Sequence, residues 1–407
     1  MESTKLAPRD KPKLGIIGWR GMVGSVLLER MKCEADFNYF QTTFYSSSQA
    51  GSAAPAIDDN TGKNAGNLLS NPTIGDAYDY SDLSKLDIIL TTQGGSYSEK
   101  VLPKLRHMGW QGYWIDAAST FRMHPNTKIV LDPINRADLL TAISQGIKTF
   151  AGANCSTATL LLGLAGLFQA SLIETLSFMS YQSISGAGAQ AMKELIAQHD
   201  YISKNQSAHA HHTHSAIEQE KNLTQALHDE NFPKTSLSVP LATNILPWID
   251  SDLGTGSSRE ELKTMDETNK ILSIAAHKRI PIDGTCVRVG VLRSHSFGCT
   301  IRLRKNLAIA EIEQIIAGAH PWVKLIPNTK EATLRHLTPI ACAKTLDIHV
   351  GRLRKTRIDA YTINAFVIAD QLLWGAAEPL RRMLHLILER YAHEPTLFNN
   401  ENALIKK

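Results

Sequence analysis

Short apolar runs alternate with polar turns through the first third of the chain. Lys13–Gly18 has the length and composition of a buried strand, and the residues from Ser25 to Met31 have the apolar spacing of a helix. Further apolar runs of strand length lie at 40–45, 86–92, 112–116 and 129–133. Because strands buried on both faces appear as continuous apolar runs, this region predicts a parallel sheet with helices between its strands.

The first strand runs directly into a glycine-rich turn, Gly18-Trp-Arg-Gly-Met-Val-Gly24, and then into the helix. In this arrangement the glycines let the backbone approach a pyrophosphate, and the helix N-terminus meets its negative charge. The spacing is G-x-x-G-x-x-G, and a tight strand-to-helix turn without a ligand could also use these glycines. We therefore predict a Rossmann-type dinucleotide-binding domain.

The pattern changes in the second half of the chain. Strand-type alternation at 178–182, 281–295, 300–304, 350–355 and 361–369 is mixed with helical spacing at 189–197, 257–263 and 309–318, whereas 222–246 reads as irregular. This favours a second, α+β domain with a mostly antiparallel sheet. We expect an α/β protein in which residues 12–153 form the dinucleotide-binding domain, a closing helix at 371–392 completes it, and 154–370 form a catalytic and oligomerisation domain.

Composition excludes several classes of protein. The 407 residues are 43% hydrophobic, enough for two cores, but the longest nearly apolar run, 158–170, is too short to cross a bilayer. The five cysteines are scattered, which argues against a disulfide framework or a zinc site, and the His-rich tract 209–214 reads as a surface loop. With a net charge of +4 and no apolar leader at the N-terminus, we expect a cytoplasmic protein with no metal, nucleic-acid or membrane partner.

Cys155 has the most reactive predicted setting among the cysteines. It follows the turn Phe150-Ala-Gly-Ala-Asn154 and precedes an apolar helical run. The unpaired N–H groups and the positive end of a helix favour the thiolate over the thiol, so Cys155 is a candidate nucleophile. The alternative is a small buried residue that begins a core helix.

The end of the second strand bears on the choice of cofactor. An NAD-binding fold usually carries an acidic residue there, but this chain has Ser46-Ser-Ser-Gln49. Hydroxyl groups, with Arg20 from the glycine turn, suit a 2′-phosphate, so NADP(H) is favoured over NAD. A polar loop after an edge strand is the other interpretation.

Several motifs in one order carry a family resemblance. They begin at Gly18, Gln93, Asp116, Gly152, Arg288 and Asp370, and read GWRGMVG, QGG, DAAS, GANCS, RVGVLRSH and DQLLWGAAEPLRR. Together they resemble the bacterial aspartate-β-semialdehyde dehydrogenases of the enterobacterial type, from about Leu14 to about Arg382. The resemblance implies reduction of L-aspartyl-4-phosphate by NADPH to L-aspartate 4-semialdehyde and phosphate, a step toward lysine, diaminopimelate, methionine, threonine and isoleucine.

The resemblance also assigns roles to residues. Cys155 forms the thioester, His295 is the general base and Gln182 orients the substrate, which Arg288 and Glu260 also hold. Arg122 and Lys263 bind phosphate. The cofactor contacts are Gly18, Arg20, Gly21, Met22, Val23, Ser47, Ser48, Gln93, Ser185, Gly186 and Gln371. Each has a structural alternative, such as a solvated Glu260–Lys263 pair or a buried, satisfied His295.

The spacing of Arg288 and His295 makes a structural demand. They are seven positions apart, so they would point to opposite faces of one uninterrupted strand. For both to reach one pocket, Gly290 or the end of the strand must turn the chain.

The partners and the alternatives follow from the same resemblance. We expect a small-molecule substrate, inorganic phosphate and a homodimer, since the broad face of an antiparallel sheet suits self-association. N-acetylglutamyl-phosphate reductase is the alternative enzyme, although Glu260, placed to receive a free amino group, argues against an acylated amine. Glyceraldehyde-phosphate dehydrogenase fits the motifs less well, and a non-catalytic dinucleotide-binding regulator is the alternative from another class.

Overall fold

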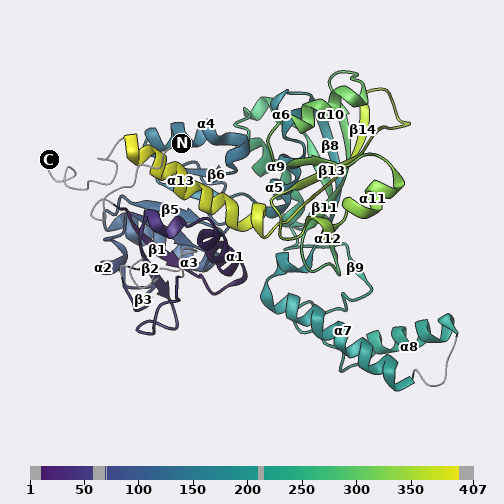
Figure 1. Ribbon diagram of the computed structural model, residues 1–407, viewed down its shortest axis with the longest axis horizontal. Coiled ribbons are helices and arrows are strands. Elements are labelled where there is room, and N and C mark those ends of the chain that lie inside the picture. The colour runs from purple at the N-terminus through teal and green to yellow at the C-terminus, as the bar shows by residue number, and fades with distance from the viewer. Residues whose placement is uncertain (1–10, 58–68, 70, 210–214, 394–407) are drawn as a thin grey trace. The chain divides into compact units, whose positions relative to one another are not determined.

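The computed structural model describes residues 11–57, 69, 71–209 and 215–393, without the side chains of 206–209, 392 and 393, and the chain forms two compact units (Figure 1). The first comprises Met1–Ala158, Asp266–Arg279 and Leu373–Lys407, and the second comprises Thr159–Met265 and Ile280–Leu372. Residues 266–279 fall within the range predicted for the second domain, but they pack with the first unit.

The first unit is built on a sheet of seven parallel strands in the order β3-β2-β1-β4-β5-β7-β6. The strands are β1 (Lys13–Ile17), β2 (Gln41–Ser46), β3 (Gly75–Asp76), β4 (Ile88–Thr91), β5 (Tyr113–Asp116), β6 (Thr127–Val130) and β7 (Thr149–Gly152). The order reverses direction between β1 and β4, which is the point where open parallel sheets bind ligands. This sheet confirms the predicted Rossmann-type fold.

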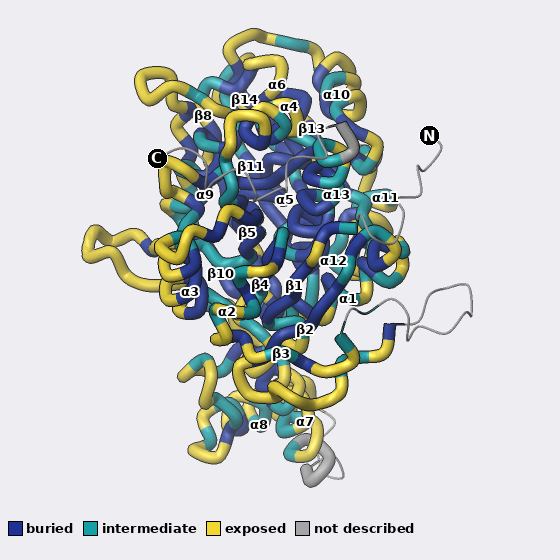
Figure 2. The backbone as a smooth tube through the Cα atoms, turned by 90° about the vertical axis from the view of Figure 1, so that its left-hand side faces the viewer, coloured by how far each residue is buried: buried dark blue, intermediate teal, exposed yellow. Residues whose placement is uncertain are grey.

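Alternating side chains divide this sheet between two cores. Ile16 and Phe44 face one core, whereas their neighbours Ile17 and Tyr45 face the other. The first core packs against α1 (Met22–Cys33), η1 (Asp36–Tyr39), α4 (Asp132–Ser144) and α13 (Glu378–His393), and the second against α2 (Tyr80–Leu83) and α3 (Gly95–His107). With both faces covered, the central strands are buried along their length (Figure 2).

The second unit contains a mixed sheet in the order β12-β13-β14-β11-β8-β10-β9. The strands are β8 (Ile173–Gln182), β9 (Ile245–Leu246), β10 (Ile282–Val289), β11 (His295–Leu303), β12 (Val323–Leu325), β13 (Ile348–Lys355) and β14 (Thr362–Ala369). The β8–β10 and β12–β13 pairs are parallel and the other four are antiparallel, which confirms the mostly antiparallel second sheet.

The remaining helices of the second unit either cover its sheet or connect its strands. They are α6 (Ala165–Gln169), η3 (Ile184–Ala187), α7 (Ala189–His209), α8 (Ala216–His228), α10 (Ile309–Ala317), α11 (Lys330–His336) and α12 (Pro339–Cys342). The residues of α5 (Cys155–Gly163) and α9 (Arg259–Ile271) are divided between the two units, whereas η4 (Ala276–Lys278) and η5 (Leu373–Ala377) belong to the first, where η5 contacts α1 and α13. Helices α7 and α8 form a hairpin that projects from the second unit (Figure 1).

Two predicted segments differ from the structure. Residues 222–246 were expected to be irregular, but α8 continues through them to His228. The closing helix was expected from 371; instead a π-helical turn, η5, begins at Leu373, and regular helix begins at Glu378. The delay has a local cause, because the Asp370 side chain accepts a hydrogen bond from the Leu372 N–H at 3.0 Å, which holds the chain in a turn.

Candidate functional site

The glycine turn between β1 and α1 forms a pocket of about 310 Å³ at the switch point of the parallel sheet. Gly18 has a φ of 79°, and a Cβ there would lie 2.5 Å from the backbone nitrogen of Gln93, so only glycine fits. A Cβ at Gly24 would lie 2.4 Å from the Gly18 carbonyl oxygen. Both glycines therefore bring backbone segments together, and Gly21, Met22 and Val23 open α1 beside the pocket.

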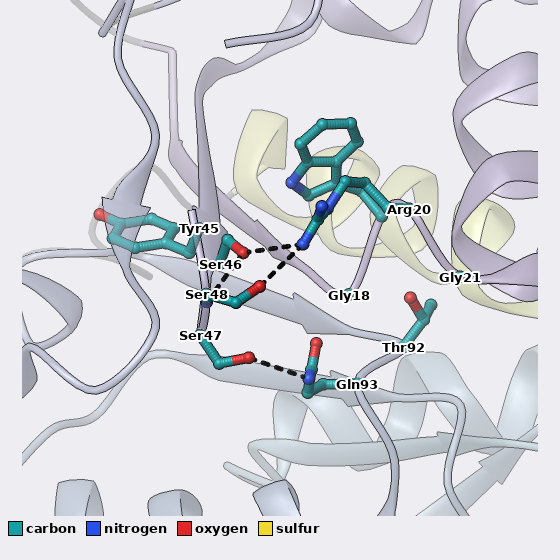
Figure 3. A pocket seen from close by; sticks show the side chains of 10 residues that line it. Gly18, Arg20, Gly21, Tyr45, Ser46, Ser47, Ser48, Thr92 and Gln93 are labelled. Carbon is teal, nitrogen blue, oxygen red and sulfur yellow. Dashed lines mark hydrogen bonds between the residues drawn. The ribbon is translucent and has the colours of Figure 1, made fainter. Parts of the chain in front are cut away.

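The pocket presents one cation among hydroxyl groups (Figure 3). Nη2 of Arg20 donates to Oγ of Ser48 at 3.0 Å and to Oγ of Ser46 at 3.3 Å. On the opposite wall, Nε2 of Gln93 donates to Oγ of Ser47 at 3.4 Å. No carboxylate is among the residues that line it, so the described pocket suits an anion.

Cys155 is the first residue of α5, as its sequence setting predicted. The Asn154 side chain caps the helix, because its Oδ1 accepts from the N–H groups of Ser156 at 2.8 Å and Thr157 at 3.1 Å. The backbone of Gly375 packs on the cysteine, since a Cβ at Gly375 would lie 2.3 Å from that of Cys155. Cys155 therefore lies at a capped helix N-terminus, with the Gly375 backbone packed against its Cα and Cβ.

Arg122 is buried near the same helix start, within the first unit. Its Nε donates to the Gly152 carbonyl at 2.7 Å, and its Nη1 lies 3.1 Å from Oε1 of Glu267. The other oxygen of Glu267 accepts from the Asn154 N–H at 2.8 Å. Arg122 is therefore a buried arginine that is held by protein partners, rather than a solvent-exposed surface arginine.

In the second unit, Gln182, Glu260 and Lys263 form a connected polar group. Nε2 of Gln182 lies 3.4 Å from Oε1 of Glu260, whose other oxygen lies 3.3 Å from Nζ of Lys263. Lys263 also pairs with Asp250 at 2.5 Å. The amine of Lys263 is therefore shared by two carboxylates, of which Glu260 is buried.

Arg288 and His295 come together although they belong to different strands. Strand β10 ends at Val289 and β11 begins at His295, so the chain turns between them, with a φ of 78° at Ser294. Nη1 of Arg288 donates to the Ser183 carbonyl at 2.7 Å, and Nδ1 of His295 accepts from the Ser183 N–H at 3.1 Å. The structure therefore meets the demand for a turn that the sequence spacing made.

The environment of His295 disfavours its charged form. The imidazole is fully buried and lies near the guanidinium of Arg288. Burial first, and then the Arg288 charge, hold the pKa of His295 well below its usual range, against a weaker opposing effect of the Ser294 backbone. At neutral pH the ring is uncharged.

Ser185, Gly186 and Gln371 surround the same histidine. A Cβ at Gly186 would lie 3.0 Å from Nη1 of Arg288 and 3.3 Å from Cε1 of His295. The Gln371 side chain hydrogen-bonds to Oγ of Ser185 and accepts from the Ser294 N–H at 2.7 Å. Ser185 and Gln371 are therefore buried with the predicted base, and the exposed Gly186 lies close to it.

Several residues of these groups were not predicted from the sequence. Ser183 and Glu267 are contact residues whose roles depend on tertiary structure, and Gly375 lies in the irregular turn η5. Asn154 could have been found, because asparagine directly before an apolar helical run is a common helix cap.

Two further features concern membranes and metals. No helix in the described part of the chain is both long and apolar enough to cross a bilayer. Within the same residues, histidine, cysteine and carboxylate side chains do not gather in groups of three that could hold a metal ion. The His-rich tract lies outside the described residues, apart from the backbone of His209.

Two protein-family models match separate stretches of this chain. A family described as "Semialdehyde dehydrogenase, NAD binding domain" matches residues 13–142, and "Semialdehyde dehydrogenase, dimerisation domain" matches residues 164–374. The solved aspartate semialdehyde dehydrogenase from Francisella tularensis is 44% identical, with a TM-score of 0.86 over 93% of this chain and 100% of that one.

Two more distant structures share the fold. Aspartate semialdehyde dehydrogenase II from Vibrio cholerae, solved in complex with ASA, is 24% identical, with a TM-score of 0.74 over 94% of this chain and 99% of that one. The enzyme from Candida albicans, solved with NADP, is 16% identical, with a TM-score of 0.61 over 93% and 98%.

Proposed function

Because this chain belongs to the semialdehyde dehydrogenase family, we propose that it is the oxidoreductase that converts L-aspartyl-4-phosphate to L-aspartate 4-semialdehyde and phosphate. The observation that carries this proposal is Cys155 at the capped N-terminus of α5, in a chain 44% identical to an aspartate semialdehyde dehydrogenase. The product would feed the biosynthesis of lysine, diaminopimelate, methionine, threonine and isoleucine. The cytoplasm is the proposed compartment, and the cysteines among the described residues carry thiols, which is consistent with it.

The chemistry requires a nucleophile and an electron donor. The Cys155 thiolate attacks the acyl carbon, and the carbon–oxygen bond to phosphate breaks to leave a thioester on sulfur. NADPH, when bound, would supply a hydride to this thioester carbon, and cleavage of the carbon–sulfur bond would then restore the Cys155 thiolate. In this scheme Gln182 orients the substrate, and His295 acts by hydrogen bonding at its carbonyl group.

The pocket beside the glycine turn supports NADP(H) as the cofactor. Arg20 is hydrogen-bonded to Ser46 and Ser48 at the carboxyl end of β2, and Ser47 and Gln93 lie across the pocket from it. A guanidinium and several hydroxyl groups can bind a 2′-phosphate, whereas the ribose hydroxyls of NAD usually need a carboxylate there. We therefore propose NADP(H) as the cofactor, with Gly18, Gly21, Met22 and Val23 at its pyrophosphate.

The two ends of the substrate require different partners. We assign Arg288 to the substrate carboxylate and Glu260 to its amino group, since each presents the opposite charge from a buried position. Lys263 and Arg122 are assigned to phosphate. Both already pair with carboxylates, so phosphate would compete with Asp250 for Lys263 and add to the Glu267 contact of Arg122.

An exposed sheet face supports a homodimer. Along β8, Leu176, Phe178 and Ser180 are buried, whereas Met179 and Tyr181 on the opposite face are 41% and 39% exposed. Tyr181 stacks on Phe366 of β14, with ring centroids 6.4 Å apart. An apolar face of this kind within residues that match a dimerisation domain suits contact with a second copy.

The test is phosphate-dependent reduction of NADP⁺ with L-aspartate 4-semialdehyde, the reverse reaction. N-acetylglutamate semialdehyde and NAD⁺ are run in parallel to test the alternative enzyme and the cofactor. We expect turnover with the unacylated aldehyde and NADP⁺, and its loss in Cys155→Ala with NADPH binding retained. The exposed Cys33 provides the matched control, Cys33→Ala, which should keep full activity.

Three outcomes would contradict the proposal. Turnover of only the acylated aldehyde would favour N-acetylglutamyl-phosphate reductase. Normal NADPH binding without turnover of either aldehyde would favour a non-catalytic regulator. Activity that survives in Cys155→Ala would remove Cys155 as the nucleophile.

A further inference from the structure

A chain of hydrogen bonds joins Gln371 to His295 through two serines. Gln371 bonds Oγ of Ser185, which lies 3.1 Å from Oγ of Ser183, and this oxygen lies 3.1 Å from Nδ1 of His295. All four side chains are buried, with at most 4% of any residue exposed. Because bulk water does not reach these groups, their protons must be arranged so that the partners satisfy one another.

Two backbone amides fix that arrangement, since an N–H group can only donate. The Ser294 N–H donates to Gln371 at 2.7 Å, which identifies the bonded atom as the amide oxygen and leaves the Gln371 NH₂ group to donate to Ser185. At the other end, the Ser183 N–H donates to Nδ1 of His295 at 3.1 Å. Nδ1 must therefore offer its lone pair.

The two hydroxyl groups between these ends can then donate in only one direction, from Ser185 toward His295. Ser185 accepts from Gln371, so its own O–H can donate to Ser183, whose O–H can in turn donate to Nδ1. With no proton on Nδ1, the single proton of a neutral imidazole lies on Nε2. Among the described residues Nε2 has no hydrogen-bond partner.

We propose that Ser183 is a positioning residue that holds His295 in the tautomer with its proton on Nε2, so that the ring presents a hydrogen-bond donor. The catalytic consequence of this inference rests on the proposed function. The carbonyl oxygen of the substrate gains negative charge when the thiolate adds to it and again when hydride arrives. A neutral Nε2–H stabilises that oxygen by donating a hydrogen bond, and the proton stays on the ring.

The surroundings of His295 agree with a neutral donor. Burial and the Arg288 guanidinium both oppose the charged imidazolium. Arg288 itself donates to the Ser183 carbonyl at 2.7 Å, so the peptide that fixes the tautomer also fixes this neighbouring cation. The general-base role predicted from the sequence would need a lone pair on Nε2, which this tautomer does not have.

The direct test is nitrogen NMR of the full chain labelled with ¹⁵N in the histidine rings, without substrate. The chain has 15 histidines, and the variant His295→Asn identifies the signals of His295 by their loss. We expect a protonated, pyrrole-type Nε2 and an unprotonated, pyridine-type Nδ1 for His295. The opposite pattern, with the proton on Nδ1, would overturn the proposal.

Variants separate the role of Ser183 from the general stability of the fold. Ser183→Ala keeps the backbone donor but removes the hydroxyl, so the Nδ1 signal should move, and kcat should fall about fivefold at unchanged KM for NADPH. Ser183→Thr should restore both. Ser144→Ala removes a hydroxyl that bonds the Leu140 carbonyl on α4 of the first unit and should change neither.

The outcomes distinguish this inference from the proposed function. An unchanged Nδ1 signal and unchanged kcat in Ser183→Ala would overturn the positioning role. The Nδ1–H tautomer in an enzyme that turns over aspartate semialdehyde would overturn the inference alone. The Nε2–H tautomer in a protein without this activity would support the inference and defeat the proposed function.

Discussion

Arg122 and Glu267 form a buried ion pair in which Nη1 lies 3.1 Å from Oε1. The same carboxylate accepts from the Asn154 N–H at 2.8 Å, one residue before Cys155. Glu267 therefore neutralises a guanidinium proposed to bind phosphate and also fixes the backbone that precedes the proposed nucleophile. Arg122 donates at the same time to the Gly152 carbonyl at 2.7 Å, so its orientation is set from two sides.

The first prediction concerns this pair. Glu267→Gln keeps the shape of the side chain but leaves Arg122 with an uncompensated buried charge, which costs about 3 kcal/mol in comparable buried pairs. We expect a lower urea midpoint for unfolding and a lower kcat/KM in the phosphate-dependent assay.

The control is an exposed ion pair in the same unit, Arg136 with Glu389, whose side chains are 48% and 43% exposed. Glu389→Gln should change stability by less than about 1 kcal/mol, since water screens such pairs. Equal effects of the two substitutions would show that burial of Glu267 gives it no special role.

The sequence predicted the parts of this protein that depend on local patterns. The parallel strands were visible as apolar runs, and the glycine turn was visible as spaced glycines before helical spacing. The start of α5 at Cys155 was predicted for the same reason. Each of these features is set within about ten residues of chain.

Most contacts that were missed join distant parts of the chain. Glu267 lies 113 residues from the amide that it binds, and Gln371 lies 186 residues from Ser185. Distant contacts also hold the turn before α13, because Asp370, which accepts locally from the Leu372 N–H, binds Arg293 and the Lys344 N–H as well. Periodicity carries no information on such contacts, since a side chain that binds a distant partner has no characteristic spacing.

The second prediction tests the cofactor pocket. Arg20→Ala removes the only cation from the residues that line it, so KM for NADP⁺ should rise by about tenfold or more while KM for NAD⁺ stays nearly constant. The reason is that only NADP⁺ carries the 2′-phosphate. Steady-state assays with both cofactors measure the ratio, and Arg136→Ala on the exposed surface of α4 serves as the control. Equal increases for both cofactors would place Arg20 away from the 2′-phosphate.

The third prediction concerns pH and His295. Its pKa is lowered in the folded protein by burial and by Arg288, so below about pH 6.5 the unfolded chain binds a proton that the folded chain does not. Stability should therefore be complete above pH 6.5 and fall as the pH drops from there toward the lowered folded pKa. Denaturant unfolding should show a loss about 1 kcal/mol larger in the wild type than in His295→Gln between pH 7.5 and 5.5. The same loss of stability with falling pH in the two proteins would contradict the burial of a neutral ring.

The fourth prediction tests the close approach of Gly186 to the site. A methyl group there would lie 3.0 Å from Nη1 of Arg288 and 3.3 Å from Cε1 of His295, and Arg288 cannot move without breaking its bond to the Ser183 carbonyl. Gly186→Ala should therefore lower kcat by about tenfold or more with the fold intact, as followed by circular dichroism and the same assay. Gly290→Ala is the matched control, because its added methyl group meets only the Leu241 carbonyl oxygen, at 3.5 Å, and should be tolerated. Full activity in Gly186→Ala would mean that the guanidinium and the imidazole can shift without consequence, and would remove the need for a fixed donor at Nε2.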